Sequence, residues 1–304
     1  LKPNQRFMQT YIGVDVGGSH ITAAPVNLNK GQIDELRLYR ASVNPHANAN
    51  DVLNTWAQVI AKAMRDVYRP DCLLCIAVPG PFDYEQGICL MQHVNKYDAL
   101  YGLNIRQELA KRLALGSHQI MFRNDAEAFI EGEMRFGAGQ SFQKGMGITL
   151  GTGLGTSLFE YPQAQDLGLG ITHPLYDGAA EDYLSTRWFL GRYLALSQQA
   201  VTGVKELAAR HATDRYAQQV FAEFVHNLTL VLSDFMDIYH PEIIVLGGNI
   251  TQSAELFFPQ LKQQLASYSP QVTIRLSVFH ELAGLLGAVG LELSKTPFDF
   301  IPKH

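Results

Sequence analysis

The stretch "GVDVGGSHITAAPV", Gly13–Val26, alternates apolar and polar residues up to a glycine pair and then turns apolar again. This pattern predicts a strand, a turn at Gly17-Gly18-Ser19 and a second strand, with glycine supplying positive φ at the turn. A dinucleotide-binding motif would instead lead into a helix and carry a third glycine. The turn is either an ordinary tight hairpin or a place where backbone N–H groups contact an oxyanion such as a phosphate. In the second case, Asp15 would face a metal ion that the phosphate shares.

An apolar strand followed by a glycine turn occurs again in the second half of the chain. "GMGITLGTGLGTSLFE" reads as a strand, a glycine turn and a strand, and "PEIIVLGGNI" reads as a buried strand that meets a glycine pair. We interpret the two halves as a duplication of architecture without a sequence repeat. Helices that cover mixed sheets indicate an α/β fold, and two such halves commonly share a ligand cleft.

The periodicity of apolar residues predicts the remaining elements. The segment "YPQAQDLGLGITHPLYDGA" reads as a loop. The predicted elements are strands at Tyr11–Val16, Ile21–Asn27 and Ile33–Ala41, helices at about Ala49–Tyr68 and 103–115, a strand-to-helix junction at Asn124-Asp125, helices over most of 181–240, and a final helix in "ELAGLLGAVGLELS".

Composition restricts the class of protein. The 304 residues are 47% hydrophobic and 17% charged, which is typical of a soluble globular chain of about two domains. The net charge of −5 and the absence of a basic stripe argue against nucleic acid as the main partner. No apolar run approaches the ~20 residues of a membrane span, and "LKPNQRFMQT" lacks a signal-peptide core. We therefore expect a cytoplasmic protein with no membrane association.

The chain contains only three cysteines. Cys72 and Cys75 form a C-x-x-C inside the apolar run "DCLLCIAVPG", and no second C-x-x-C accompanies them. We expect buried core cysteines, because this C-x-x-C lies in an apolar run and lacks the second C-x-x-C of a metal site.

Three glycine turns each follow an apolar strand, and together they fit a nucleotide held between the two halves. Hydroxyl groups of Ser19 and Thr152 would donate to phosphate oxygens, and the third turn would let a base or ribose lie close to the backbone. The turns are Gly17-Gly18, Gly151-Thr152-Gly153 and Gly247-Gly248.

Asn124-Asp125 lies where a predicted strand becomes a helix. One interpretation is a helix cap, and the other is a carboxylate aimed into a cleft. Phosphoryl transfer to a hydroxyl needs an acceptor that orients the hydroxyl and takes its proton. Aspartate, with a reference pKa of about 3.9, is ionised at pH 7 and suits this role.

Six motifs of the sequence together resemble those of one protein family. "VDVGGSHI", "AVPGPFD", "RNDAEAFIEGEMRFGAG", "ITLGTGLGTSL", "IIVLGGNI" and "AGLLGAVG" occur in order from about Tyr11 to Glu292, and together they resemble the ROK family of sugar kinases and repressors. The resemblance implies the actin-like ATPase fold, an α/β architecture with two RNase-H-like lobes around a central cleft. It implies a smaller lobe of residues 1–123 plus 285–304, a larger lobe of residues 124–284, and a final helix, 281–294, that packs on the first lobe.

The resemblance also implies phosphorylation of a hexose, mostly at the 6-hydroxyl, with Mg²⁺ and ATP, and a homodimer. Asp125 would be the catalytic base, and Asp15 would lie near the magnesium ion. The phosphate loops would be Gly17-Gly18-Ser19-His20 and Gly151-Thr152-Gly153, while Gly247 and Gly248 would meet the nucleoside. The sugar-binding residues would be Pro79, Gly80, Asn95, Asn124, Asp125, Glu181 and His173.

One segment departs from the family pattern. The family's E-x-G-H motif and zinc-binding cysteine cluster are missing, so no structural zinc is expected. Asp166 stands where the E-x-G-H glutamate would be and Leu169 where its histidine would be, and His173 would replace that histidine after a loop shift. The alternatives are a solvated loop residue at Asp166 and a fold residue at His173. Glu181, in "AEDYLS", aligns with a sugar-binding glutamate.

We compared four functions. A glucokinase-like hexose kinase is favoured. A sugar-responsive repressor would carry an N-terminal helix-turn-helix segment, whereas this sequence reaches its first strand near Tyr11. The altered segment 163–180 keeps open a catalytically weak sugar-binding relative, and a kinase for another sugar, such as N-acetylmannosamine or allose, is the fourth function. A polyphosphate donor would require extra basic residues, so the acidic balance favours ATP.

Overall fold

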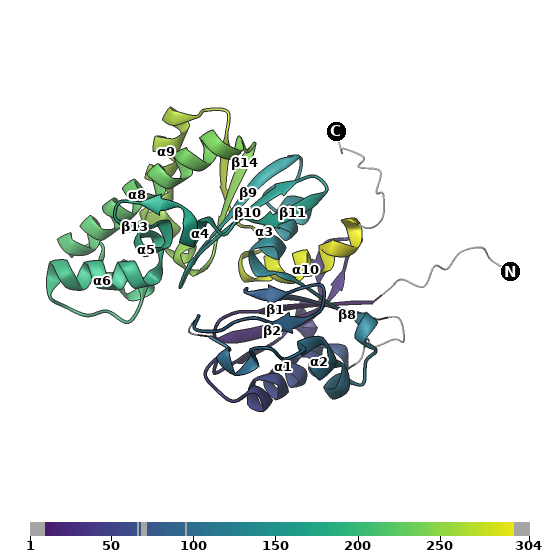
Figure 1. Ribbon diagram of the computed structural model, residues 1–304. Helices are drawn as coiled ribbons and strands as arrows, with labels where there is room; N and C mark the ends of the chain where they lie inside the picture. Colours follow the sequence, from purple (N-terminus) through teal and green to yellow (C-terminus); the bar gives the residue numbers. More distant parts are fainter. Residues whose placement is uncertain (1–9, 66, 68–71, 95, 295–304) are drawn as a thin grey trace. The chain divides into compact units, whose positions relative to one another are not determined.

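The computed structural model describes residues 10–65, 67, 72–94 and 96–294, and the side chains up to residue 290. The chain divides into two compact units, one formed by Leu1–Phe136 with Leu282–His304 and the other by Gly137–Glu281. Each unit is built on a mixed β-sheet covered by helices (Figure 1).

The sheet of the first unit has the order β3-β2-β1-β5-β8, with β4 also paired to β2. β1 and β2 form an antiparallel hairpin, whereas β1, β5 and β8 are parallel, as is typical of α/β layers. Register pairs Asp15 with Ala77 and Val78 with Asn124, so the carboxyl ends of β1, β5 and β8 lie at one edge. The strands are Tyr11–Val16 (β1), His20–Asn27 (β2), Gln32–Ile33 (β3), Tyr39–Ser42 (β4), Leu73–Val78 (β5) and Ile120–Asn124 (β8).

Helices lie on both faces of this sheet (Figure 1). The helices Ala49–Met64 (α1) and Ile105–Leu113 (α2) cover one face, and their core surrounds the fully buried Trp56. The helices Asp125–Phe136 (α3) and Ala283–Ser294 (α10) lie on the other face. Short elements complete the unit: Phe82–Asp83 (β6), Ile88–Cys89 (β7), and the 3₁₀ turns Glu35–Arg37 (η1), Asp98–Leu100 (η2) and Ser117–Gln119 (η3). The 3₁₀ turn His280–Leu282 (η5) crosses the boundary between the units.

Glycines bring α3 and α10 into backbone contact. A Cβ added at Gly287 would lie 1.7 Å from the carbonyl oxygen of Ala128, and one added at Gly132 would lie 2.3 Å from the carbonyl oxygen of Ala283. The buried guanidinium of Arg123 also donates to the carbonyl oxygen of Gly287 at 2.8 Å. Because α3 packs on α10, the boundary between the units falls after Phe136 and not at 123/124 as expected from sequence.

The second unit repeats this topology. Its sheet has the order β11-β10-β9-β14-β15, with β9 and β10 antiparallel and β9, β14 and β15 parallel. Each position corresponds to a strand in the order β3-β2-β1-β5-β8, which confirms the predicted duplication. The strands are Lys144–Leu150 (β9), Leu154–Glu160 (β10), Gln163–Asp166 (β11), Ile243–Gly247 (β14) and Thr273–Leu276 (β15).

The long helix α8 organises the core of the second unit. Its buried face contributes Phe221, Phe224 and Phe235, which contact aromatic residues of other elements, including Phe189 and Phe257. Further elements are Leu169–Thr172 (α4), Pro174–Leu175 (β12), Gly178–Ala179 (β13), Ala180–Leu184 (α5), Thr186–Ser197 (α6), Val204–Arg210 (α7), Arg215–Tyr239 (α8), Asn249–Leu256 (η4) and Phe258–Tyr268 (α9).

Two predicted elements are wrong. The single strand expected at Ile33–Ala41 is broken by η1, because the side chain of Asp34 accepts the N–H of Leu36 and starts a 3₁₀ turn. The segment expected as a loop contains β11, which pairs antiparallel with β10, and α4, where the N–H of Leu169 donates to the hydroxyl of Thr156 at 2.8 Å.

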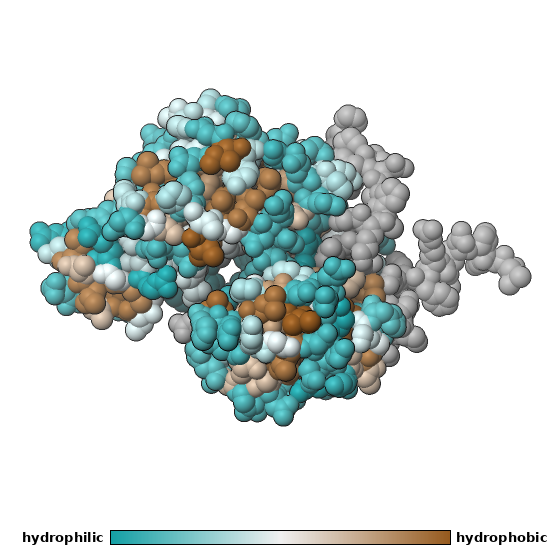
Figure 2. All heavy atoms as spheres, viewed as in Figure 1, coloured by the Kyte–Doolittle hydropathy of each residue, from teal (hydrophilic) through white to brown (hydrophobic). Residues whose placement is uncertain are grey.

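Cys72, Cys75 and Cys89 are all buried and reduced, which confirms the prediction of core cysteines. Hydrophilic residues predominate on the face shown in Figure 2, and hydrophobic residues reach the surface in separate patches. Among the described helices, none has the length and apolar composition needed to cross a membrane.

Candidate active site

In the first unit, residues from distant parts of the sequence meet at the carboxyl ends of β1, β5 and β8. The first glycine turn follows β1, Pro79-Gly80 follows β5, and Asn124-Asp125 ends β8 and begins α3. This edge of an open α/β sheet is where such folds bind their ligands. The predicted residue Asn95 lies outside the described residues.

The first glycine turn has a different geometry from the predicted one. Gly17, Gly18, Ser19 and His20 connect the paired residues at the ends of the hairpin, and the N–H of Gly17 donates to the carbonyl oxygen of His20 at 2.9 Å. Neither glycine has positive φ, so this connection is not a primed two-residue turn. Gly18 and Ser19 are exposed, and a Cβ added at Gly18 would meet nothing within 4 Å. Gly18 therefore keeps this side of the turn open, whereas a Cβ added at Gly17 would lie 2.7 Å from the ring of His20.

The buried side chain of Tyr97 holds the first glycine turn in place. Its fully buried hydroxyl donates to the carbonyl oxygen of Gly17 at 2.6 Å, and its ring meets Trp56 edge-on with 5.4 Å between centroids. Burial raises the pKa of the Tyr97 hydroxyl well above its ordinary value, and the negative charge of Asp15 raises it further. The hydroxyl thus remains a donor at neutral pH. Sequence reasoning missed Tyr97, although it lies in the segment "HVNKY" that contains Asn95.

Of the two roles considered from sequence, helix cap and cleft carboxylate, Asn124 has the first, and Asp125 is the candidate for the second. The Oδ1 atom of the buried Asn124 accepts the N–H of Ala126 at 2.7 Å and that of Glu127 at 3.1 Å, which is helix capping. Asp125, the first residue of α3, is partly exposed and accepts the Ala126 N–H at 2.9 Å. Its carboxylate at a helix N-terminus is stabilised in the ionised form.

The hydroxyl of Tyr84 connects the ends of β5 and β8. It donates to the carbonyl oxygen of Val78 at 3.3 Å and accepts from Nδ2 of Asn124 at 3.2 Å. A Cβ added at Gly80 would lie 3.3 Å from this hydroxyl, so Gly80 keeps the backbone close to it. Pro79, Gly80 and Asn124 are therefore neighbours around Tyr84, a residue that sequence reasoning did not select.

Asp15 is partly buried near the end of β1. Its Oδ1 atom lies 3.0 Å from the position that a Cβ would take at Gly284, in the first turn of α10. A carboxylate beside an open glycine turn has the oxygen ligands that Mg²⁺ prefers, so the residues present fit such an ion.

In the second unit, side chains fix the second glycine turn. The backbone N–H and the hydroxyl of Thr186 both donate to the carbonyl oxygen of Gly151, at 2.8 and 2.9 Å. Oε2 of Glu181 accepts the N–H of Leu154 at 2.9 Å and lies 2.5 Å from where Gly153 would carry a Cβ. The structure therefore places Glu181 against the Gly151-Thr152-Gly153 turn, and its role as a sugar ligand stays a prediction.

The third glycine turn lies beside the second one. Gly247 pairs with Thr149 in β9, and Gly248, at φ +87°, packs so closely that a Cβ would lie 2.3 Å from the carbonyl oxygen of Leu150. This close approach requires glycine at position 248. Both turns therefore stand at the carboxyl ends of β9 and β14.

Asp166 and His173 lie elsewhere in this unit. Asp166 is exposed at the end of β11, where its side chain accepts the N–H of Gly168 at 3.1 Å. The ring of His173 packs on Phe235 of α8, and its Nε2 lies 3.2 Å from Asp234. These contacts favour a solvated Asp166, which here ends a strand and not a loop, and the fold reading of His173. Among the described residues, no group of at least three His, Cys, Asp or Glu side chains could hold a metal ion.

Comparison with solved structures identifies the fold. A ROK family glucokinase from Streptomyces griseus, crystallised in complex with glucose and AMPPNP, superposes with a TM-score of 0.74 at 22% identity, over 94% of this chain and 99% of that chain. Together with the duplicated sheets, this likeness defines the actin-like ATPase fold expected from the sequence.

The chain belongs to the ROK family, whose model matches residues 11–160 and 176–295. The matched ranges leave out the segment that contains Asp166 and His173, where the sequence departs from the family pattern. A glucokinase from Thermotoga maritima is 26% identical over 92% of this chain and 96% of that protein. An N-acetyl-D-glucosamine kinase from Escherichia coli O1:K1 / APEC is 24% identical over 86% of this chain and 89% of that protein. These curated relatives are both sugar kinases.

Proposed function

We propose that this protein is an ATP-dependent sugar kinase that transfers the γ-phosphoryl group to a hexose hydroxyl, the 6-hydroxyl of glucose or a related sugar. The observation that carries the proposal is the partly exposed carboxylate of Asp125, at the strand edge where Asn124 and the first glycine turn also lie. Asn124 caps α3 through the N–H groups of Ala126 and Glu127, and Asp125 shares only the first of these donors.

Asp125 would act as the general base. It would accept a hydrogen bond from the sugar hydroxyl, orient the oxygen toward the γ-phosphorus, and take the proton as the new P–O bond forms. The bond between the γ-phosphorus and its bridging oxygen would break, and ADP would leave. Asn124 and Gly80, joined through Tyr84, would position the sugar.

The glycine turns would bind the phosphates. Tyr97 and Val43 donate to the carbonyl oxygens of Gly17 and Ser19, and this supports a turn whose N–H groups face an anion. In the second turn, Thr186 donates to the carbonyl oxygen of Gly151, whereas Glu181 accepts the N–H of Leu154. Mg²⁺, held by Asp15 directly or through water, would neutralise phosphate charge when bound.

The choice of sugar follows from the relatives. Of the two curated relatives compared above, the glucokinase has the higher identity and coverage, so glucose is the first sugar to test. N-acetyl-D-glucosamine is the second, because the other relative is a kinase of that sugar.

A coupled assay of ADP release tests this proposal, with Mg-ATP and a panel of hexoses and amino sugars. We expect ADP release that depends on one sugar and a matching sugar phosphate detected by mass spectrometry. Sugar binding in calorimetry without ADP release would contradict the kinase and support a non-catalytic sugar-binding protein. Turnover only with polyphosphate would contradict ATP as the donor.

A further inference from the structure

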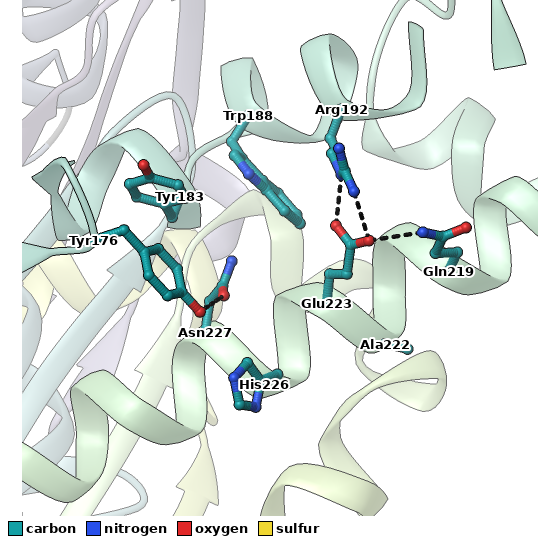
Figure 3. A pocket seen from close by; sticks show the side chains of 9 residues that line it. All are labelled: Tyr176, Tyr183, Trp188, Arg192, Gln219, Ala222, Glu223, His226 and Asn227. Atoms are coloured by element: carbon teal, nitrogen blue, oxygen red, sulfur yellow. Dashed lines mark hydrogen bonds and ion pairs between the residues drawn. The ribbon is translucent and has the colours of Figure 1, made fainter. Parts of the chain in front are cut away.

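The second unit contains a cavity that none of the glycine turns lines (Figure 3). Its volume is about 530 Å³, which lies within the range of small-molecule sites. It is bounded by the segment after β12 and by α5, α6 and α8. The lining residues are Tyr176, Tyr183, Trp188, Arg192, Gln219, Ala222, Glu223, His226 and Asn227.

Aromatic rings form one side of this cavity. Tyr176 and Tyr183 meet edge-on with 5.0 Å between centroids, and Trp188 stands beside them on α6 (Figure 3). Tyr176 is 61% exposed, so its ring is accessible from solvent. Such rings offer flat apolar faces to a ligand.

Tyr176 is held in place at an energetic cost. Its φ of +53° is rare for a bulky residue, and its hydroxyl donates at 3.0 Å to Oδ1 of Asn227, which is only 5% exposed. Strained residues of this kind persist where surrounding contacts fix them, and they collect at ligand sites. The buried amide of Asn227 thus holds the ring at the mouth of the cavity.

Planar polar groups form the other side. Nε and Nη2 of Arg192 donate to the two carboxylate oxygens of Glu223 at 2.6 and 2.8 Å, and Nε2 of Gln219 donates to the same carboxylate at 2.9 Å. The Arg192 guanidinium lowers the pKa of Glu223, so both groups stay charged and their charges cancel. A balanced ion pair favours a neutral ligand over an anion or a cation, and it presents donors and acceptors side by side.

We propose that this cavity binds a carbohydrate at a site separate from the glycine turns. The C–H face of a pyranose ring would stack on Trp188 or Tyr176, and adjacent hydroxyls would pair with the donors and acceptors of Arg192, Glu223 and Gln219. The cavity does not include Glu181, whose carboxylate contacts the second glycine turn. This inference does not rest on kinase activity.

Saturation-transfer NMR and tryptophan fluorescence test the site with glucose, N-acetyl-D-glucosamine and maltose as probes. The chain has two tryptophans, and Trp56 is fully buried in the first unit, so Trp188 reports on the cavity. We expect one probe to change the Trp188 fluorescence and to bind at least tenfold more weakly to Trp188→Ala and to Arg192→Met. Arg192→Met changes a partly exposed side chain, so it provides a second variant if Trp188→Ala misfolds.

Asn124→Ala serves as the matched control, because Asn124 belongs to the first unit. Binding at the cavity should persist in this variant. Binding that is lost in Asn124→Ala but kept in Arg192→Met would overturn the inference and leave the proposed kinase standing. A fluorescence change that depends on protein concentration without sugar would also overturn it, because a second copy of the chain would then cover the cavity.

Discussion

The hydroxyl of Tyr97 fixes one end of the first glycine turn, because it donates to the carbonyl oxygen of Gly17 from within the core. In Tyr97→Phe that carbonyl loses its partner, a change that costs about 1–3 kcal/mol. We predict a KM for ATP that rises about tenfold, with a smaller change in the KM for sugar. Steady-state kinetics against both substrates measures the difference. The half-exposed Tyr101→Phe should leave both values unchanged, and equal effects of the two variants would contradict this role.

The raised pKa of Tyr97 also predicts how the free energy of unfolding changes with pH in the alkaline range. Burial raises the pKa of Tyr97 in the folded protein, whereas in the unfolded chain it titrates near about 10. Above this pH the unfolded chain loses a proton that the folded protein keeps. The stabilising contribution of Tyr97 is therefore complete below pH ~10 and is lost as pH rises. Urea unfolding between pH 9 and 11 should show wild type losing up to about 1.4 kcal/mol per pH unit more than Tyr97→Phe. Parallel curves for the two proteins would show that Tyr97 titrates normally.

At the scale of elements, the contact between α3 and α10 depends on glycine. Gly287→Ala would place a Cβ 1.7 Å from the carbonyl oxygen of Ala128, so the helices must separate. We predict a loss of about 2–3 kcal/mol in the free energy of unfolding, because overpacking displaces backbone. Gly191→Ala in α6 is the matched control, since its Cβ would meet nothing within 4 Å. It should stabilise by up to about 1 kcal/mol. Similar melting temperatures for the two variants would contradict the close packing.

Elements with strong local signals could be predicted from the sequence. The hairpin β1–β2, the junction at Asn124-Asp125 and the terminal helix follow from alternation, capping residues and helical periodicity. The elements β11 and α4 could not be predicted, because β11 depends on pairing with β10 and α4 is fixed by the side chain of Thr156 on that strand. Short elements of this kind depend on tertiary contacts that leave no periodic pattern.

Prediction of the candidate site from the sequence is limited in the same way. The glycine turns and Asp125 are motifs that can be read along the chain, whereas Tyr84, Tyr97 and Thr186 act through single hydroxyl contacts across long sequence separations. A lone tyrosine or threonine has no motif, so only the fold reveals these supports. The glycine turn was correctly located, but its geometry was wrong, since no positive φ occurs at Gly17 or Gly18.

At the scale of the whole molecule, the first unit is discontinuous in sequence, since α10 completes it from the far end of the chain. Leu285, Leu286 and Val289 are fully buried, so a chain that ends at Glu281 would expose the surfaces of α3 and β1. We predict that this truncated chain is insoluble or is cleaved rapidly by trypsin. A chain that ends at Ser294 retains α10 and should resist trypsin as the full chain does. A stable, active chain ending at Glu281 would refute this dependence.

If Asp125 accepts the proton of a sugar hydroxyl during phosphoryl transfer, its amide variant should bind sugar without turning it over. Sugar-dependent ADP release from Mg-ATP is measured for wild type and for Asp125→Asn, with sugar affinity determined by calorimetry in both proteins. We predict turnover in the wild type and a kcat at least about a hundredfold lower in Asp125→Asn, with sugar affinity nearly unchanged. Equal turnover in the two proteins, or none in the wild type with any sugar, would contradict it.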